Sequence, residues 1–234
     1  MVLVKTISAA LSVAVISYLL GSLNFAIIVT KIAIGKDIRN FGSGNAGMTN
    51  VLRTVGIPAA VFTAIGDLGK GILSALAGEW IFSIAVEGLV PNGILYAFLN
   101  GGMYVGIIFA LLGHLFPVYH DFKGGKGILV CGGAILIMDW RVFVAILTLF
   151  LIFTLTTKIV SVGSIAATIG YPTFTCIFQC IDKAFTPTEI VVNTLLATGV
   201  AAVVILMHRE NIKRLINGTE NRFGKKKTDP SKKD

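Results

Sequence analysis

The feature that most constrains this chain is a series of apolar runs, several of them about twenty residues long. A helix rises about 1.5 Å per residue, so about twenty residues cross the hydrocarbon core of a bilayer. The runs are continuously apolar and rich in Gly and Ala, whereas the strands of a membrane barrel alternate polar and apolar residues. Charged residues make up only 14% of the 234 positions, against about a quarter in soluble domains. The pattern therefore predicts an all-α polytopic membrane protein with no separate soluble domain.

The apolar runs and the breakers between them predict seven transmembrane helices, at 8–30, 55–85, 93–116, 127–139, 142–157, 159–181 and 189–207. The fourth and fifth depend on Asp139-Trp140-Arg141 forming a turn at the membrane interface, and a single helix over 127–157 would leave six. With seven spans and the N-terminus outside, sixteen of the twenty Lys and Arg residues lie inside, in keeping with the positive-inside rule. We therefore expect a cytoplasmic C-terminus, one transmembrane domain over 1–220, and a basic cytoplasmic tail over 221–234.

Three polar segments interrupt the apolar background, and the predicted topology puts all of them at the cytoplasmic face. The first covers residues 42–50 and is followed by Arg53. Its glycines allow a ligand to approach the backbone closely, and Arg53 offers a fork that suits a phosphate or carboxylate. Taken singly, Ser43, Asn45 or Asn50 would be ordinary residues of a Gly/Asn-rich loop. The density of polar donors beside an arginine favours a binding site.

The second polar segment begins near His114 and ends in Lys123-Gly124-Gly125-Lys126-Gly127, just before an apolar run. Two lysines among three glycines form a cationic, backbone-rich loop suited to phosphate. It is not a nucleotide-binding P-loop, because Gly127 follows Lys126 where Ser or Thr would hold magnesium. A positive-inside anchor would explain the lysines but not the glycines beside them.

The third polar segment covers residues 208–220 and starts where the last apolar run ends. His208 and Asn211 are spaced i,i+3, so they share one face of a helix at the membrane surface. A histidine there can act as an acid, a base or a hydrogen-bond donor near neutral pH. Glu220 is predicted to form a structural ion pair with one of the basic residues around it.

A fourth feature is the pair Asp67 and Lys70 inside the second apolar run, three residues apart on one helix face. Ionisable residues at membrane depth are functional candidates by default, and a mutual ion pair inside the bundle is an equally good interpretation.

The three cysteines lie in apolar segments and are interpreted as packing residues. No metal-ligand cluster, Ser-His-Asp spacing or candidate thiolate is present in the sequence, and the juxtamembrane basic residues lack the aromatics typical of nucleic-acid binding. The residues alone therefore indicate a phosphate-bearing substrate at the bilayer surface and leave the reaction open.

The three polar segments, SGNAGMTNVLR, GHLFPVYHDFKGGKG and HRENIKRLINGTE, resemble in order and spacing the three motifs of the acyl-phosphate:glycerol-3-phosphate acyltransferase family, PlsY. The resemblance covers nearly the whole chain. It implies transfer of a fatty acyl group from acyl phosphate to the 1-hydroxyl of sn-glycerol 3-phosphate, giving lysophosphatidate and phosphate in phospholipid synthesis. It also implies a bacterial inner-membrane enzyme that has its active site at the cytoplasmic face and uses no metal or other cofactor. Its partners would be the two substrates, the bilayer and the soluble enzyme that makes acyl phosphate, without nucleic acid.

Carried over by position, the resemblance implies four catalytic residues, Ser43, Arg53, His208 and Asn211. The substrate-binding residues it implies are Asn45, Thr49, Asn50, His114, Lys123, Gly124, Gly125, Lys126, Gly127 and, from a shorter match, Ser161. Glu220 would be structural. The general base is left open between His208 and a substrate phosphate oxygen.

Two rival functions fit parts of the sequence. An organic-phosphate transporter or flippase would use the same basic inner face, but it predicts polar residues through the whole bilayer, and only Asp67 and Lys70 meet that description. A lipid-phosphate kinase would need a nucleotide loop, which the second segment does not provide.

Overall fold

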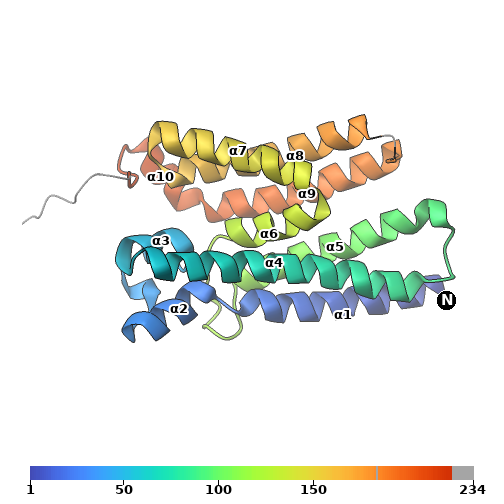
Figure 1. Cartoon of the computed structure of the whole chain (residues 1–234), viewed down its shortest axis with the longest axis horizontal. Helices are drawn as coiled ribbons and strands as arrows, with labels where there is room; N and C mark the ends of the chain where they lie inside the picture. The colour runs from blue at the N-terminus through green and yellow to red at the C-terminus, as the bar shows by residue number, and fades with distance from the viewer. Residues whose placement is uncertain (183, 223–234) are drawn as a thin grey trace, which may run out of the picture.

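The computed structural model describes residues 1–182 and 184–222, and this part of the chain is built from helices and loops without strands (Figure 1). The helices are α1 (Val2–Ser22), α2 (Phe25–Ile34), the 3₁₀ turn η1 (Ile38–Asn40), α3 (Met48–Thr54), α4 (Ile57–Val86), α5 (Asn92–Leu115), α6 (Ile128–Met138), α7 (Trp140–Thr157), α8 (Val160–Ile181), α9 (Pro187–Met207) and α10 (Arg209–Ile216). Most of the predicted basic tail, residues 223–234, lies outside the described residues.

Six stretches of the described chain are long and apolar enough to cross a membrane, which agrees with an all-α polytopic membrane protein. They are α1 with α2, α4, α5, α7, α8 and α9. The fourth predicted span corresponds to α6, which has only 11 residues and is about 16 Å long. The predicted turn between the fourth and fifth spans is present, because Asp139 separates α6 from α7 and its side chain accepts a hydrogen bond from Arg141 N at 2.9 Å.

The first predicted span, 8–30, is not one continuous helix. It divides at Leu23 and Asn24 into α1 and α2, and Asn24 caps the second helix by accepting a hydrogen bond from Ile27 N at 3.2 Å. The Asn24 amide also donates to Ala46 O at 3.4 Å, so the break holds α2 against the polar loop that follows it. Hydropathy does not reveal such a break, since a buried asparagine changes the mean of an apolar run very little.

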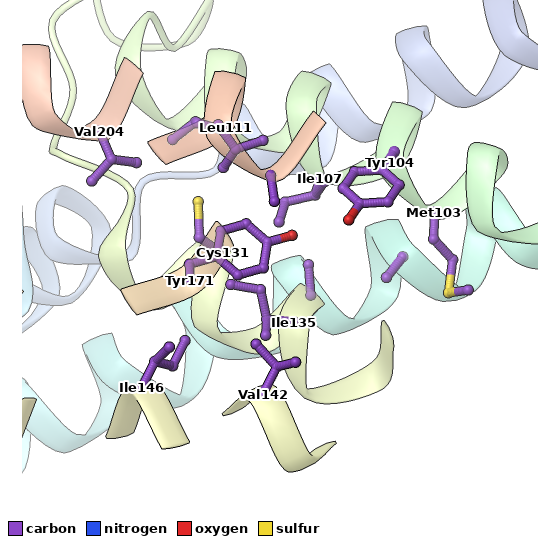
Figure 2. Close-up of a cluster of buried hydrophobic side chains, with 14 of the residues drawn as sticks. Met103, Tyr104, Ile107, Leu111, Cys131, Ile135, Val142, Ile146, Tyr171 and Val204 are labelled. Atoms are coloured by element: carbon purple, nitrogen blue, oxygen red, sulfur yellow. The ribbon is translucent and has the colours of Figure 1, made fainter. Parts of the chain in front are cut away.

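The helices form two groups, with α1, α4 and α5 on one side and α7, α8 and α9 on the other (Figure 1). The first group packs closely, because a Cβ on Gly78 of α4 would lie 2.1 Å from Gly102 O of α5. Helix α6 lies between the groups, and the apolar core formed around it takes side chains from α4 to α9 (Figure 2). Cys131 is buried in this core as expected, whereas Cys180 lies exposed on α8, so the packing interpretation was wrong for Cys180.

One end of the molecule gathers the three polar segments. The loop between α2 and α3, the loop between α5 and α6, and helix α10 all lie there, and the N-terminus lies at the opposite end (Figure 1). The junction of α7 and α8 reaches the same end. The fold thus brings together segments that are more than 150 residues apart in the chain.

Candidate active site

A pocket of about 140 Å³ lies where these segments meet. Most of the residues predicted from the sequence line it: Ser43, Asn45, Thr49, Asn50, Arg53, His114, Lys126, Gly127, Ser161, His208, Asn211 and Glu220. These side chains come from the first loop, α3, α5, the second loop, α8 and the region around α10. The four residues predicted to be catalytic are therefore neighbours around one cavity.

Asn50 shapes the first loop from within. Its amide Nδ2 donates to Phe41 O at 2.9 Å and to Asn45 O at 3.1 Å, and its Oδ1 accepts from Ser43 N at 3.0 Å. The side chain is only 2% exposed. Both ends of the amide are thus committed to the backbone on either side of Ser43, so Asn50 holds Ser43 at the pocket wall rather than offering a free group of its own.

A chain of polar contacts crosses the pocket from the second loop to the third segment. Lys126 Nζ donates to Asn211 Oδ1, and Asn211 Nδ2 donates to Glu220 Oε1 at 2.9 Å. The other oxygen of Glu220 pairs with Arg214 Nε at 2.7 Å. The ion pair expected of Glu220 is confirmed, and its consequence is local: Glu220 fixes the amide of Asn211 so that its oxygen faces Lys126.

Lys126 is held in a setting that disfavours its charge. Burial, together with the charges of the nearby Arg214 and Arg53, lowers the pKa of Lys126 to about 8, and the charge of Glu220 partly opposes this shift. Burial also lowers the pKa of the Arg53 guanidinium. The pocket thus disfavours the charged forms of Lys126 and Arg53. It is suited to an anion, because a bound phosphate would offset the repulsion between these cations.

His208 sits at the junction of α9 and α10 and is 3% exposed. Its Nδ1 lies 2.8 Å from Val204 O. A carbonyl oxygen can only accept, so Nδ1 carries the proton and Nε2 keeps its lone pair. Burial lowers the pKa of His208, and the charge of Lys126 acts in the same direction. The ring is therefore neutral at neutral pH and presents a proton acceptor through Nε2.

Ser161 lies in the first turn of α8 and is 6% exposed. Its Oγ has no hydrogen-bond partner among the described residues, although the residue lines the pocket. A buried hydroxyl normally finds a partner. Ser161 is thus available for a polar group of a ligand, in line with its predicted binding role.

Lys123, Gly124 and Gly125 do not line the pocket. Gly124 N donates to Leu115 O at 3.0 Å and Gly125 N donates to His114 O at 3.1 Å, so this part of the loop packs against the end of α5. Lys123 is exposed. Spacing within a glycine-rich loop predicts its flexibility but not which of its lysines turns inward, and only Lys126 with Gly127 does so.

Two charged residues of the pocket wall, Arg214 and Asp67, were missing from the predicted set. Arg214 lines the pocket and follows Asn211 by three positions, so the helical spacing that united His208 and Asn211 could have included it. Asp67 of α4 also lines the pocket, next to His114. Asp67 was recognised as unusual, but nothing in the sequence brings the interior of α4 to the site.

An apolar cavity of about 340 Å³ adjoins the polar pocket. It lies between α4, α6, α7, α8 and α9, and it shares Ile128, Leu129 and Phe150 with the pocket wall. Its surface is formed almost wholly by carbon, including Gly132 and Tyr171. A polar, cationic site is thus joined to a space that suits a hydrocarbon chain.

The fold and the site together define an integral membrane protein whose binding site suits an amphiphile with an anionic head. The sequence model of the family described as glycerol-3-phosphate acyltransferase matches residues 11–218. A glycerol-3-phosphate acyltransferase of Clostridioides difficile (strain 630) is 37% identical over 216 residues, covering 92% of this chain and 96% of that protein. Glycerol-3-phosphate acyltransferase 2 of Bacillus anthracis is 37% identical over 212 residues, covering 89% and 96%.

Two crystal structures of PlsY, an integral membrane glycerol 3-phosphate acyltransferase, share the fold. The glycerol 3-phosphate form is 34% identical, with a TM-score of 0.73 and coverage of 92% of this chain and 96% of that one. The lysophosphatidic acid form is 32% identical, with a TM-score of 0.70 and coverage of 92% and 95%. The chain belongs to the glycerol-3-phosphate acyltransferase family, and it is a membrane acyltransferase.

Proposed function

We propose that this protein transfers a fatty acyl group from acyl phosphate to the 1-hydroxyl of sn-glycerol 3-phosphate, giving lysophosphatidate and inorganic phosphate. The observation that carries the proposal is the union of a cationic pocket with an apolar cavity through Ile128, Leu129 and Phe150. Both substrates carry a phosphate, and one carries a long acyl chain. A site with these two parts accommodates both.

The phosphates would be held by Lys126 and Arg53, with Thr49, Asn45 and Ser161 as further polar contacts on the pocket wall. Each bound phosphate would favour the charged form of Lys126, whose pKa burial and its cationic neighbours lower to about 8. The affinity of the site for phosphate and the protonation of this lysine are thus coupled.

The acyl chain would lie in the apolar cavity beside α6. Gly132 leaves part of this space open, because a Cβ there would contact only Leu68 and Phe143 at ordinary distances of 3.7 and 3.8 Å. Each methylene moved from water into such a space contributes about 0.8 kcal/mol. The cavity thus provides the affinity for a long-chain donor.

An acyl phosphate is already activated, so the reaction needs no nucleophile from the enzyme. The 1-hydroxyl oxygen attacks the acyl carbonyl carbon, the carbon–oxygen bond to phosphate breaks, and phosphate leaves with that electron pair. The hydroxyl proton passes to His208 Nε2 or to an oxygen of the leaving phosphate. Ser43 and Asn211 orient the hydroxyl or the developing oxyanion, and Arg53 neutralises the phosphate charge.

For the topology we propose that α6, although short, completes a seven-pass arrangement over the domain 1–220, with the N-terminus outside and a basic cytoplasmic tail at 221–234. The support is the distribution of basic residues in the sequence, because this arrangement would put sixteen of the twenty Lys and Arg residues on the cytoplasmic side. The active site would then face the cytoplasm from a bacterial inner membrane. There it would receive acyl phosphate from the soluble enzyme that makes it.

The test is a phosphate-release assay on the purified protein in lipid, with palmitoyl phosphate and glycerol 3-phosphate supplied together and each omitted in turn. Release that needs both substrates, with lysophosphatidate appearing in equal amount, is expected. Absence of release from a folded sample would refute the proposal. Uptake of glycerol phosphate into vesicles without phosphate release would then favour the transporter.

A further inference from the structure

The Lys70 ammonium, buried inside the bundle on α4, is not used by the proposed chemistry. It donates to Gly21 O at 2.9 Å and to Leu23 O at 2.8 Å, which are carbonyls at the break between α1 and α2. It also lies 2.9 Å from Asp67 Oδ1 and 2.9 Å from His114 Nδ1. Lys70 is 3% exposed. One ammonium thus joins the helix break, its own helix and the end of α5.

These contacts are more than an ion pair placed for charge balance. Neutralising Asp67 would require only its contact with Lys70, but the ammonium also reaches the break carbonyls and the imidazole of His114. Replacing a buried ion pair by apolar residues is often neutral for stability, so the pair itself is weak evidence for a stabilising role. The additional partners indicate that the position of the ammonium is what matters.

The contact with Lys70 fixes the tautomer of His114. A lysine ammonium has three donors and no acceptor, so the ring nitrogen that faces it must accept. Nδ1 of His114 is therefore unprotonated, and the ring proton is on Nε2. His208 has the opposite arrangement, with its proton on Nδ1.

The Nε2 side of His114 faces the two loops of the site. A Cβ on Gly125 would lie 2.3 Å from His114 Nε2 and 2.5 Å from Ala46 O, so the second loop and the first loop meet at the edge of this ring. His114 and Asp67 both line the polar pocket. Only a glycine at position 125 lets the loop come this close to the imidazole.

We propose that Lys70, held by Asp67, is a positioning residue that keeps His114 in the Nε2–H form, so that the ring donates a hydrogen bond to a phosphate-bearing substrate at the base of the pocket. The proposal rests on the proposed function and deepens it. The site then contains two histidines in opposite tautomers: Nε2 of His114 donates a hydrogen bond, and Nε2 of His208 accepts one.

The test combines a spectroscopic measurement with kinetics. Protein labelled with ¹⁵N-histidine in lipid nanodiscs gives the protonation of each ring nitrogen, and the chain has only three histidines. Spectra of His120→Gln and His208→Gln variants assign the signals of His114 by elimination. In the wild type at pH 7, His114 is expected to show an unprotonated Nδ1 and a protonated Nε2. A protonated Nδ1, or a cationic ring, would overturn the proposal.

The informative variant is the double change Asp67→Asn with Lys70→Met, because Lys70→Met alone would leave a buried carboxylate unpaired and could prevent folding. In the folded double variant, His114 is expected to become a mixture of tautomers. The KM for one of the two phosphate substrates should rise about ten-fold, as for the loss of one hydrogen bond to a charged group. Measuring both KM values shows which substrate His114 contacts. Ser74→Ala, a buried change one turn along α4, is the matched control and should alter neither measurement.

The outcomes separate cleanly. If the double variant folds and keeps both KM values and the wild-type tautomer, Lys70 does not position His114. If the wild type makes no lysophosphatidate, the proposed function fails, and the tautomers of wild type and double variant still decide the positioning role by themselves.

Discussion

The sharpest prediction concerns the basic limb of the pH–rate profile and its origin in Lys126. Burial and the charges of Arg214 and Arg53 lower the pKa of this lysine to about 8 from its ordinary 10.5. The difference corresponds to about 3 kcal/mol against the ammonium form in the empty site. Above pH 8 the fraction of Lys126 that carries a charge falls about ten-fold per pH unit. We therefore expect kcat/KM for glycerol 3-phosphate, which reports the free enzyme, to be about ten-fold lower at pH 9 than on its plateau.

Stability should move in the opposite direction over the same range. Because the pKa of Lys126 is lower in the folded protein than in the unfolded chain, the unfolded chain binds more protons between pH 8 and about 10.5. The free energy of unfolding then rises with pH, by at most about 1.4 kcal/mol per pH unit from this group. Activity that falls while the apparent Tm is steady or rising cannot be ascribed to denaturation.

The assay is phosphate release with palmitoyl phosphate held well below its KM, so that the site is mostly empty when glycerol 3-phosphate binds, and each rate is corrected for hydrolysis without enzyme at the same pH. Lys126→Arg keeps a cation that does not titrate in this range, so its relative rate should stay flat to pH 9.5. Lys213→Arg on the exposed side of α10 is the control and should retain the wild-type profile. The reasoning is refuted if the wild type shows no basic limb below pH 9.5, or if Lys126→Arg shows the same limb.

Three further predictions test neighbouring parts of the site. Glu220→Gln removes a carboxylate whose charge raises the pKa of Lys126, so the basic limb should move to lower pH and the Tm should fall. An unchanged pH–rate profile would show that Glu220 does not act on the pKa of Lys126. His208→Gln should lower kcat by about 10²- to 10⁴-fold at pH 7 with the KM values little changed, whereas a near-normal rate would assign the proton to a phosphate oxygen. Gly132→Leu should reduce the apolar cavity and shift preference from palmitoyl to shorter donors, measured as a ratio of kcat/KM values. Gly199→Leu on the exposed side of α9 should leave that ratio unchanged.

The sequence predicted the helices that depend on hydropathy alone and missed the features that depend on single contacts. Helix α4 begins and ends within two residues of its predicted span, because a long apolar run has few alternatives in a bilayer. The break at Asn24 was missed, since its cause is one buried amide that caps α2. The 11-residue α6 lies within its predicted bounds of 127–139, because the turn that ends it was predicted from Asp139-Trp140-Arg141.

The candidate site was predictable where residues share one segment and unpredictable where segments meet. His208 and Asn211 were placed together from their spacing, and both line the pocket. Lys123 and Lys126 looked equivalent, and only the pairing of the loop with the end of α5 separates them. Asp67 reaches the pocket beside His114 of α5, and this meeting of two helices is a tertiary fact that no spacing within α4 encodes.

The wall shared by the polar pocket and the apolar cavity has a kinetic consequence. Donor and product carry the same hydrocarbon tail, so a tail seated beside Phe150 can stay in place while phosphate is exchanged for glycerol phosphate at the head. Contacts to the tail are then equally strong before, during and after the reaction, and such uniform binding lowers KM without raising kcat. It also retains the product. Inhibition by lysophosphatidate should therefore strengthen with chain length in step with donor affinity, and both should level off at the length that fills the cavity.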